Sequence, residues 1–268
     1  MTAEPGAEAE SATEAPPSLS QFREAVAEDL RQLAALHDRE PDRELIHALH
    51  AARFPENMGL QLASEAGIAA CRRVAEGLAL LPDPPDQEIV DWLAVDYADI
   101  YLSHALRASP FESVWLDEDQ LLNQQPMFEI RKWYEHYGVA TQNWRQRSDD
   151  HITIQLQFLA LLLLPAPDEE ESEAETRLAD AARFMDEHLL RWLPDFALRV
   201  SERCGTVYFA GVALLSDAYL DQLRDHLAAL LDQPRPSRKE IDERLAPKNE
   251  KGSEEIMCNQ SPGAAPSW

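Results

Sequence analysis

The sequence predicts an all-α protein, organised as a single compact helical domain of about eight to ten helices. Along most of the chain, apolar residues recur at every third or fourth position, which is the spacing of an amphipathic helix. Almost no segment alternates polar and apolar residues with the period of two that is typical of strands. Helix start and stop signals divide the pattern, such as Asp83-Pro84-Pro85-Asp86 before one apolar stretch and Gly138 after another.

Residues 152–164 form the most apolar of these segments. Large apolar side chains occupy nearly the whole circumference of the predicted helix, so we expect it to be buried on all sides. Pro165 ends it. Ser148 is the predicted N-cap, which puts Asp149 and Asp150 in the first turn, where carboxylates suit the positive end of the helix dipole. We expect this helix to form the centre of the core.

His151 completes a polar cluster at the start of this helix, directly after Asp149 and Asp150. Helix capping accounts for the two carboxylates, with a stabilisation of about 1–2 kcal/mol. It accounts less well for the histidine, because a positive charge is unfavourable at the N-terminal end of a helix. Two interpretations stay open: a structural helix start with a neutral, hydrogen-bonded histidine, or the mouth of a binding site.

The other helices are predicted from the same periodicity and from proline, glycine and capping residues. Their expected ranges are about 20–36, 42–52, 60–80, 87–104, 126–137, 174–191, 194–204 and 208–230. In this scheme Ser20 caps the first helix and Pro194 opens the penultimate one. The segment 109–117 is unusually aromatic for a connection between helices, and we expect it to be a loop.

Acidic residues dominate the composition. The chain has 24 lysine and arginine residues against 49 aspartate and glutamate residues, which gives a net charge of −25. This charge opposes binding to nucleic acid and to anionic membranes, and it favours cationic partners. The longest apolar run, residues 158–164, is far shorter than the roughly 20 residues that a membrane-spanning helix needs. We therefore expect no stable membrane insertion.

The two ends of the chain and the cysteines bear on domain organisation and location. Residues 1–19 are predicted to be a disordered acidic tail, residues 20–232 the helical domain, and residues 233–268 a mobile C-terminal tail. The N-terminus lacks the basic and apolar regions of a signal peptide. Three cysteines without a paired C-x-x-C motif fit a reducing compartment. We expect a cytoplasmic protein.

No motif in the sequence supports a catalytic or metal site. Glycine is scarce, and no pair in the predicted domain is close enough to form a phosphate-binding loop. Glu44 and His47 have the spacing of half a di-iron site, but the other half is missing. Asp150-His151 reverses the His-Asp order of metal phosphohydrolases, and neither H-E-x-x-H nor G-x-S-x-G occurs. We expect no enzyme, no catalytic residue and no metal ligand, and a metal- or nucleotide-dependent hydrolase stays as the weakest alternative.

Three short segments follow a pattern that one family shares. Residues 110–117 are similar to P-x-x-S-V-[YW]-x-[DE], residues 149–151 to E-P-[DE]-D-H at the start of an apolar helix, and residues 188–196 to H-L-x-x-W-x-x-x-F. In this order, and over about residues 20–231, the chain resembles the TorD/DmsD-type chaperones of redox-enzyme maturation. It departs from them at Arg147 and Ser148, where the family usually has Glu-Pro.

The resemblance implies a binding function. Proteins of this family are cytoplasmic, system-specific chaperones that bind the twin-arginine leader, the apo form, or both, of a molybdenum-containing oxidoreductase. They assist cofactor insertion and prevent premature export. Such leaders are cationic and then apolar, so an acidic protein with an aromatic groove is complementary to both halves. The resemblance further implies a monomer or a domain-swapped dimer, with no tightly bound cofactor and only transient binding of molybdopterin or GTP.

The residues that match the family's segments are the candidate leader- and client-binding residues. They are Pro110, Phe111, Ser113, Trp115, Asp149, Asp150 and His151, to which we add the aromatic residues Trp92 and Tyr97 of a preceding helix. Taken singly, such aromatic side chains are more often core residues than binding surface. Together the set predicts a groove between the aromatic segment and the start of the buried helix.

Two other functions stay open on the sequence. One is an assembly chaperone of the nitrate-reductase type, which acts on a subunit that is not exported. The other is the hydrolase named above. A pulldown with a leader peptide distinguishes the first from the main interpretation, and turnover assays with nucleotides, with and without divalent metal, test the second.

Overall fold

The computed structural model describes residues 18–103, 105–141 and 147–245. In these ranges every regular element is a helix, which confirms the all-α prediction. The one β-type feature of the described chain is an isolated antiparallel bridge between Phe111 and His151. The chain divides into two units, one ending at Arg235 and one beginning at Pro236.

The first four helices begin where capping residues occur. They are α1 (Leu19–Asp38), α2 (Arg43–Ala51), α3 (Glu65–Ala79) and α4 (Gln87–Tyr97). Each cap side chain, Ser18, Asp42, Ser64 or Asp86, accepts a hydrogen bond from the backbone N–H three residues later. The prediction that Ser20 caps the first helix is wrong by two residues, because Ser18 and Gln21 form a reciprocal capping box.

The central helices follow the predicted order, with two departures. They are η1 (Ala98–Leu102), a π-helical continuation of α4, then α5 (Ser113–Leu116), α6 (Gln125–His136) and α7 (Ile152–Leu163). The aromatic segment, predicted to be a loop, therefore contains a short helix, α5. Gly138, with φ +66°, follows the end of α6 as expected for a helix stop.

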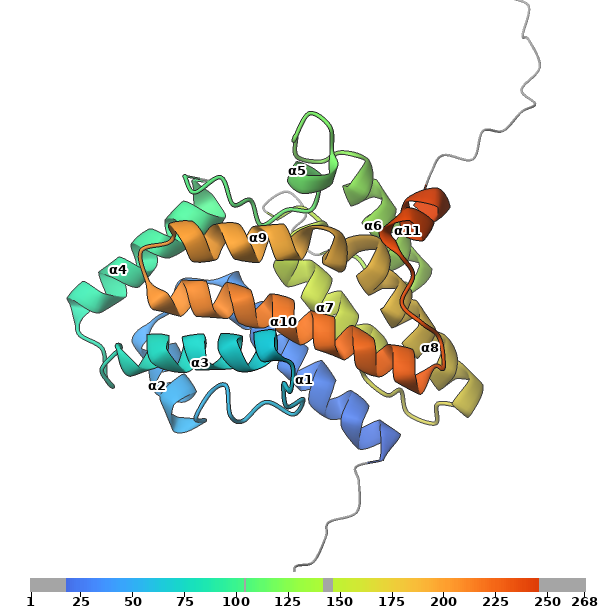
Figure 1. The fold of residues 1–268 in the computed structure, drawn as a ribbon, viewed down its shortest axis with the longest axis horizontal. Helices are drawn as coiled ribbons and strands as arrows, with labels where there is room; N and C mark the ends of the chain where they lie inside the picture. The colour runs from blue at the N-terminus through green and yellow to red at the C-terminus, as the bar shows by residue number, and fades with distance from the viewer. Residues whose placement is uncertain (1–17, 104, 142–146, 246–268) are drawn as a thin grey trace, which may run out of the picture. The chain divides into compact units, whose positions relative to one another are not determined.

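The prediction that Pro194 opens a new helix is wrong. Three elements run on without a break, α8 (Glu171–Phe184), the π-helical η2 (Met185–Leu189) and α9 (Leu190–Arg203), and Pro194 lies inside α9. A π-helical turn changes the backbone bonding register and is a common site of helix bending. In Figure 1, α8 and α9 accordingly run in different directions on either side of this turn.

The longest helix, α10 (Val207–Leu230), is the centre of the packing. It lies between α3 and α9, and α1 packs along α7 behind this row (Figure 1). Two glycines allow α3 and α10 to approach closely. A Cβ atom on Gly77 would lie 2.8 Å from the backbone of Tyr208, and one on Gly211 would lie 2.8 Å from the backbone of Val74. The crossing therefore brings the two backbones into contact.

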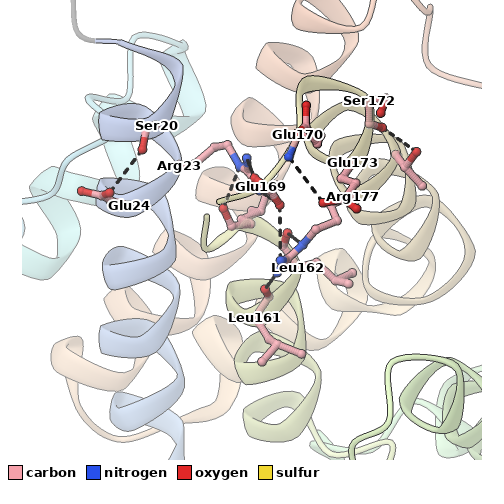
Figure 2. Close-up of polar contacts among 12 residues, drawn as sticks. Ser20, Arg23, Glu24, Leu161, Leu162, Glu169, Glu170, Ser172, Glu173 and Arg177 are labelled. Carbon is pink, nitrogen blue, oxygen red and sulfur yellow. Dashed lines mark hydrogen bonds and ion pairs between the residues drawn. The ribbon is translucent and has the colours of Figure 1, made fainter. Parts of the chain in front are cut away.

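Two arginines cap the C-terminal end of α7. Arg23 of α1 donates from Nε to the Leu163 carbonyl at 3.0 Å, and Arg177 of α8 donates from Nε to the Leu162 carbonyl at 3.1 Å. Glu169 forms ion pairs with both arginines (Figure 2). These contacts satisfy carbonyls that the helix end leaves without partners, and they connect α1, α7 and α8.

The two tails fall largely outside the described residues. Residues 1–17 and 246–268 lie beyond them, so the predicted disorder of the N-terminal tail and the predicted mobility of the C-terminal tail stay predictions. In the described part of the predicted C-terminal tail, residues 233–245, the chain forms α11 (Arg238–Leu245). In the described part of the chain, no helix is both long and apolar enough to cross a membrane.

Candidate functional site

The start of α7 differs from the sequence prediction. His151, in place of Ser148, is the N-cap: its Nδ1 accepts a hydrogen bond of 3.1 Å from the backbone N–H of Thr153. Asp149 and Asp150 therefore precede the helix and do not form its first turn. A neutral, hydrogen-bonded histidine was one of the two interpretations left open by the sequence, and a neutral imidazole has a nitrogen that can accept a backbone N–H.

Backbone hydrogen bonds join the first two motif segments. The Ile152 N–H donates to the Pro110 carbonyl at 2.9 Å, and the Glu112 N–H donates to the Asp150 carbonyl at 3.1 Å. The Asp150 side chain adds a third bond, because its Oδ2 accepts from the Ser113 N–H at 2.9 Å. The predicted proximity of the aromatic segment and the start of the buried helix is therefore present as a short bridged contact.

The third motif segment joins the same junction through buried polar side chains. Glu112 Oε1 lies 2.9 Å from His188 Nδ1, and Glu112 Oε2 accepts from Gln155 Nε2 at 2.8 Å. All three residues are buried. Burial raises the pKa of Glu112, and the nearby Asp150 raises it further, whereas His188 lowers it. We call Glu112, Asp150, Gln155 and His188 the junction cluster.

Sequence reasoning missed three members of the junction cluster. Glu112 and His188 stand inside the first and third segments. Neither was selected, since the family patterns gave no reason to pair them. Gln155 lies in the helix that the sequence predicts to be apolar on nearly all sides, and it was not selected as a site residue. Its position one turn after His151, on the face toward Asp150, was the available signal.

The predicted site residues of the two bridged segments are mostly inaccessible. Pro110, Ser113, Asp149, Asp150 and His151 are buried, and the last two are 0% and 3% exposed. The structure brings these residues together as predicted, but it buries them inside the contact between the two segments.

Two aromatic residues of the first segment are half-buried. The Phe111 ring meets the His151 ring edge-on at 5.0 Å. The Trp115 indole donates to the Ser109 carbonyl at 2.8 Å, and the Arg199 guanidinium lies 4.5 Å from its ring centre. Both rings therefore fix the segment in position as well as bordering the surface.

The two predicted residues of α4 have opposite environments. Trp92 is 60% exposed. Tyr97 is buried and donates its hydroxyl to the Asp38 carbonyl at 2.8 Å, which ties α4 to the end of α1. Trp92 is thus accessible to a partner in this structure, whereas Tyr97 is part of the helix packing.

Asp149 lies between the buried junction and an open surface. Its Oδ2 accepts from Arg131 Nε at 2.8 Å, and its backbone carbonyl accepts from the Tyr134 hydroxyl at 2.9 Å. The Asp149 side chain is 5% exposed, and the Arg131 side chain that covers it is 39% exposed. Arg131 is therefore the layer between Asp149 and solvent.

Two adjoining cavities open on this side of α6 and α7. The larger, of about 700 Å³, is lined by Asp38, Tyr134, Val139, Ala140, Thr141, Arg147, Ile154, Gln157, Phe158 and Leu161. The smaller, of about 220 Å³, is lined by Arg131, Tyr134, Glu135, Val139, Ala140, Thr141 and Asp149. We call the two together the α6–α7 groove. Of the predicted site residues, Asp149 lines it.

The described residues contain no group of three or more histidine, cysteine, aspartate or glutamate side chains that could hold a metal ion. His47, which has the spacing of a di-iron ligand with Glu44, lies at the surface with its Nδ1 3.0 Å from Asp83. Cys71 and Cys204 are free thiols. The arrangement of the described site offers hydrogen bonds, charge and apolar surface for binding.

Comparison with known proteins identifies the family of the chain. Residues 65–198 match the family model described as nitrate reductase delta subunit, a range that contains all three motif segments. The chain is 31% identical over 164 residues to the chaperone protein TorD of Vibrio cholerae serotype O1 strain O395, covering 60% of this chain and 73% of that protein. The chain belongs to the TorD-type chaperone family.

Other relatives carry the same name. The TorD proteins of Vibrio vulnificus strain YJ016 and Aliivibrio fischeri strain ES114 are 31% and 32% identical over 129 and 130 residues. These matches cover 47% and 48% of this chain, and 59% and 60% of those proteins. Since its relatives are chaperones, this TorD-type protein is a chaperone and not an enzyme.

Proposed function

We propose that this TorD-type chaperone assists the maturation of a molybdenum-containing oxidoreductase. It binds the twin-arginine leader, the apo form, or both, and so delays export until the cofactor is inserted. The observation that carries the proposal is the α6–α7 groove, an open, partly apolar groove lined by three carboxylates, Asp38, Glu135 and Asp149, in a chain of net charge −25. Since the client is held before export, the chaperone acts in the cytoplasm.

The groove is a better contact surface for the leader than the junction cluster. Asp150, at 0% exposure, has its Oδ2 bonded to the Ser113 N–H, so a leader would reach it only if the bridged segments separated. Asp149 is the next residue in the chain and lines the groove. We infer that the junction cluster fixes the start of α7 and thereby fixes Asp149 at the groove.

The larger cavity suits the apolar half of a leader. Ile154, Phe158 and Leu161 of α7 line it on successive turns, and Leu161 is 38% exposed. Burial of apolar side chains against such a surface supplies most of the affinity in helix-in-groove recognition. Trp92 lies on α4, outside the residues that line the groove, and its part in leader binding is a separate prediction.

The charge of the chain suits the cationic half. A chain with 49 acidic and 24 basic residues attracts a cationic segment over a distance of several ångströms, and salt screens this attraction. The apolar contact is not screened. Leader affinity should therefore fall from low to physiological salt without disappearing.

The test is titration of a synthetic leader, two adjacent arginines followed by an apolar run, into the full chain by calorimetry. Leu161→Asp should weaken binding about tenfold or more, because it puts a charge in the apolar part of the groove. Leu198→Asp, at a leucine of α9 that is 53% exposed and outside the groove, is the matched control. Equal affinities of the two variants would contradict the groove as the leader site.

A second function is favoured by the name of the matching family model, nitrate reductase delta subunit. In this alternative the client is a subunit that is not exported, and recognition does not need a leader. Pulldown of a client with and without its leader separates the two. Oligomeric state and transient binding of molybdopterin or GTP are further predictions, for light scattering and equilibrium dialysis.

A further inference from the structure

The α6–α7 groove has a repeated feature that the leader proposal does not use. Its two cavities share one wall, formed by Tyr134, Val139, Ala140 and Thr141. On each side of this wall lies one aspartate–arginine pair. Asp38 and Arg147 line the larger cavity, and Asp149 and Arg131 line the smaller.

In both pairs, a partly exposed arginine forms an ion pair with the aspartate. Arg147 forms an ion pair with the Asp38 carboxylate and donates from Nη2 to the Asp38 carbonyl at 2.9 Å. Arg131 lies 2.8 Å from Asp149 Oδ2 through Nε and 2.7 Å through Nη2. The Arg147 and Arg131 side chains are 30% and 39% exposed, so both are partly in contact with solvent.

Structural ion pairing alone does not explain the Arg147–Asp38 pair. Its two side chains are 30% and 40% exposed, and pairs with this degree of exposure contribute little to stability. Burial lowers the pKa of Arg147, so desolvation of this guanidinium is a cost. Residues 147–151 resemble a family segment that usually begins with a glutamate, and Arg147 stands at the position of that carboxylate. Two guanidiniums on the walls of an otherwise acidic chaperone therefore call for another role.

We propose that Arg131 and Arg147 are resident counter-ions that occupy the carboxylates of Asp149 and Asp38 until the two arginines of a leader displace them. The inference rests on the proposed function. It assigns one leader arginine to each cavity of the groove. Consecutive side chains of an extended segment point to opposite sides, so two adjacent arginines that cross the shared wall reach both cavities.

The exchange makes the groove selective for paired arginines. Replacing one guanidinium by another keeps charge-assisted hydrogen bonds to the aspartate, and the displaced side chains regain water. A ligand with a single cationic residue displaces one resident arginine and leaves the other in place, and a neutral ligand displaces neither. Selectivity thus comes from competition as well as attraction.

The first test uses Arg131→Gln and Arg147→Gln in the full chain, with a peptide that has two adjacent arginines before an apolar run. Each variant should bind this peptide about two- to fivefold more tightly than the unchanged chain, because the competing counter-ion is gone. A peptide with both arginines replaced by glutamine should show no gain. A peptide with one alanine between the arginines should show less, because both side chains then point to one side.

Arg72→Gln is the matched control, since it removes an exposed arginine of α3 that is paired with Glu76, and it changes the net charge equally. If it improves peptide binding as much as the groove variants, the gain is general electrostatics and the proposal is overturned. Weaker or unchanged binding by both groove variants also overturns it. Arg147→Lys, which keeps the charge but not the fork geometry, serves if Arg147→Gln does not fold.

A second measurement does not depend on a leader. Ethylguanidinium should raise the melting temperature of Arg147→Gln and Arg131→Gln saturably by filling the vacated place, and should not do so for Arg72→Gln. Rescue without any peptide binding would support the resident counter-ions and contradict the proposed function. Peptide binding without rescue or affinity gain would retain the function and overturn the inference. Absence of both overturns both.

Discussion

Glu112 and His188 lie 76 positions apart in the sequence, and a hydrogen bond of 2.9 Å joins their side chains inside the core. Glu112 belongs to the segment before α5, and His188 to the π-helical turn η2. Gln155 of α7 bonds the other carboxylate oxygen. The Glu112 backbone N–H also donates to the Asp150 carbonyl, so one buried residue connects all three motif segments that mark the family.

The first prediction concerns the Glu112 side chain. Glu112→Ala should lower the free energy of unfolding by about 2–4 kcal/mol, because it leaves His188 and Gln155 buried without their partner. Urea denaturation at neutral pH measures the change. Glu202→Ala, at an exposed position of α9, should stay within about 0.5 kcal/mol. A loss for Glu112→Ala as small as the control's would mean that water replaces the missing carboxylate.

The second prediction follows from the arginine contacts at the end of α7. Hydrogen bonding from Arg23 lowers the pKa of Glu169 below the unfolded value of about 4.3. The stability that this carboxylate contributes is therefore complete above that unfolded value and is lost as the pH falls through the folded pKa. Glu169→Gln should cost about 1–3 kcal/mol at neutral pH, since Arg23, 2% exposed, would lose its charged partner.

Melting curves of Glu169→Gln and the unchanged chain between pH 7 and pH 3 test the sign. The two curves should converge as the pH falls through the lowered folded pKa of Glu169, because the unchanged carboxylate is then protonated as well. Glu118→Gln, at an exposed position after α5, should show no such convergence. A difference that stays constant down to acid pH would indicate a loss of packing instead of charge.

The third prediction concerns the crossing of α3 and α10. Gly211→Ala should destabilise the chain by about 1–3 kcal/mol, because the new Cβ atom would lie 2.8 Å from the backbone of Val74 and the helices must move apart. Gly77→Ala should act in the same way from the opposite helix. Once one substitution has separated the helices, the second should cost less, so a double variant with additive losses would contradict a shared crossing.

Helix positions could be predicted from the sequence because their signals are local. Asp42, Asp86 and Gly138 act within a few residues of the helix end, and the predicted starts of α2 and α4 agree with the structure. Ser20 and Ser148 failed as caps for different reasons. Ser18 forms a local capping box with Gln21, whereas His151 caps α7 next to the backbone bridge with the aromatic segment.

The candidate site was predicted in part because only half of it is local. The proximity of residues 110–117 and 149–151 followed from the resemblance, and backbone hydrogen bonds between them are present. The burial of Asp150 and His151 could not be read from the sequence, since it results from the bridge itself. The α6–α7 groove is assembled from α1, α6, α7 and the segment after α6, and no sequence pattern links these four elements.

The last prediction separates a positioning role from a contact role for the acidic pair. Asp150 Oδ2 holds the Ser113 N–H from a fully buried position, so Asp150→Ala should lower stability by about 1–3 kcal/mol. His151→Ala removes the N-cap of α7 and should cost about 1 kcal/mol. Neither should weaken leader binding to the folded protein by more than about twofold, because neither side chain reaches the groove.

Asp149→Asn should give the opposite result. The Asp149 side chain lies under the partly exposed Arg131, so its loss of charge should cost little stability and weaken binding of a leader with two adjacent arginines about five- to tenfold. Titration of a labelled leader beside a melting curve, for all three variants, measures both quantities. Strong loss of binding by folded Asp150→Ala or His151→Ala, with Asp149→Asn unaffected, would mean that the bridged segments separate when a client binds and that the junction cluster itself is the contact surface.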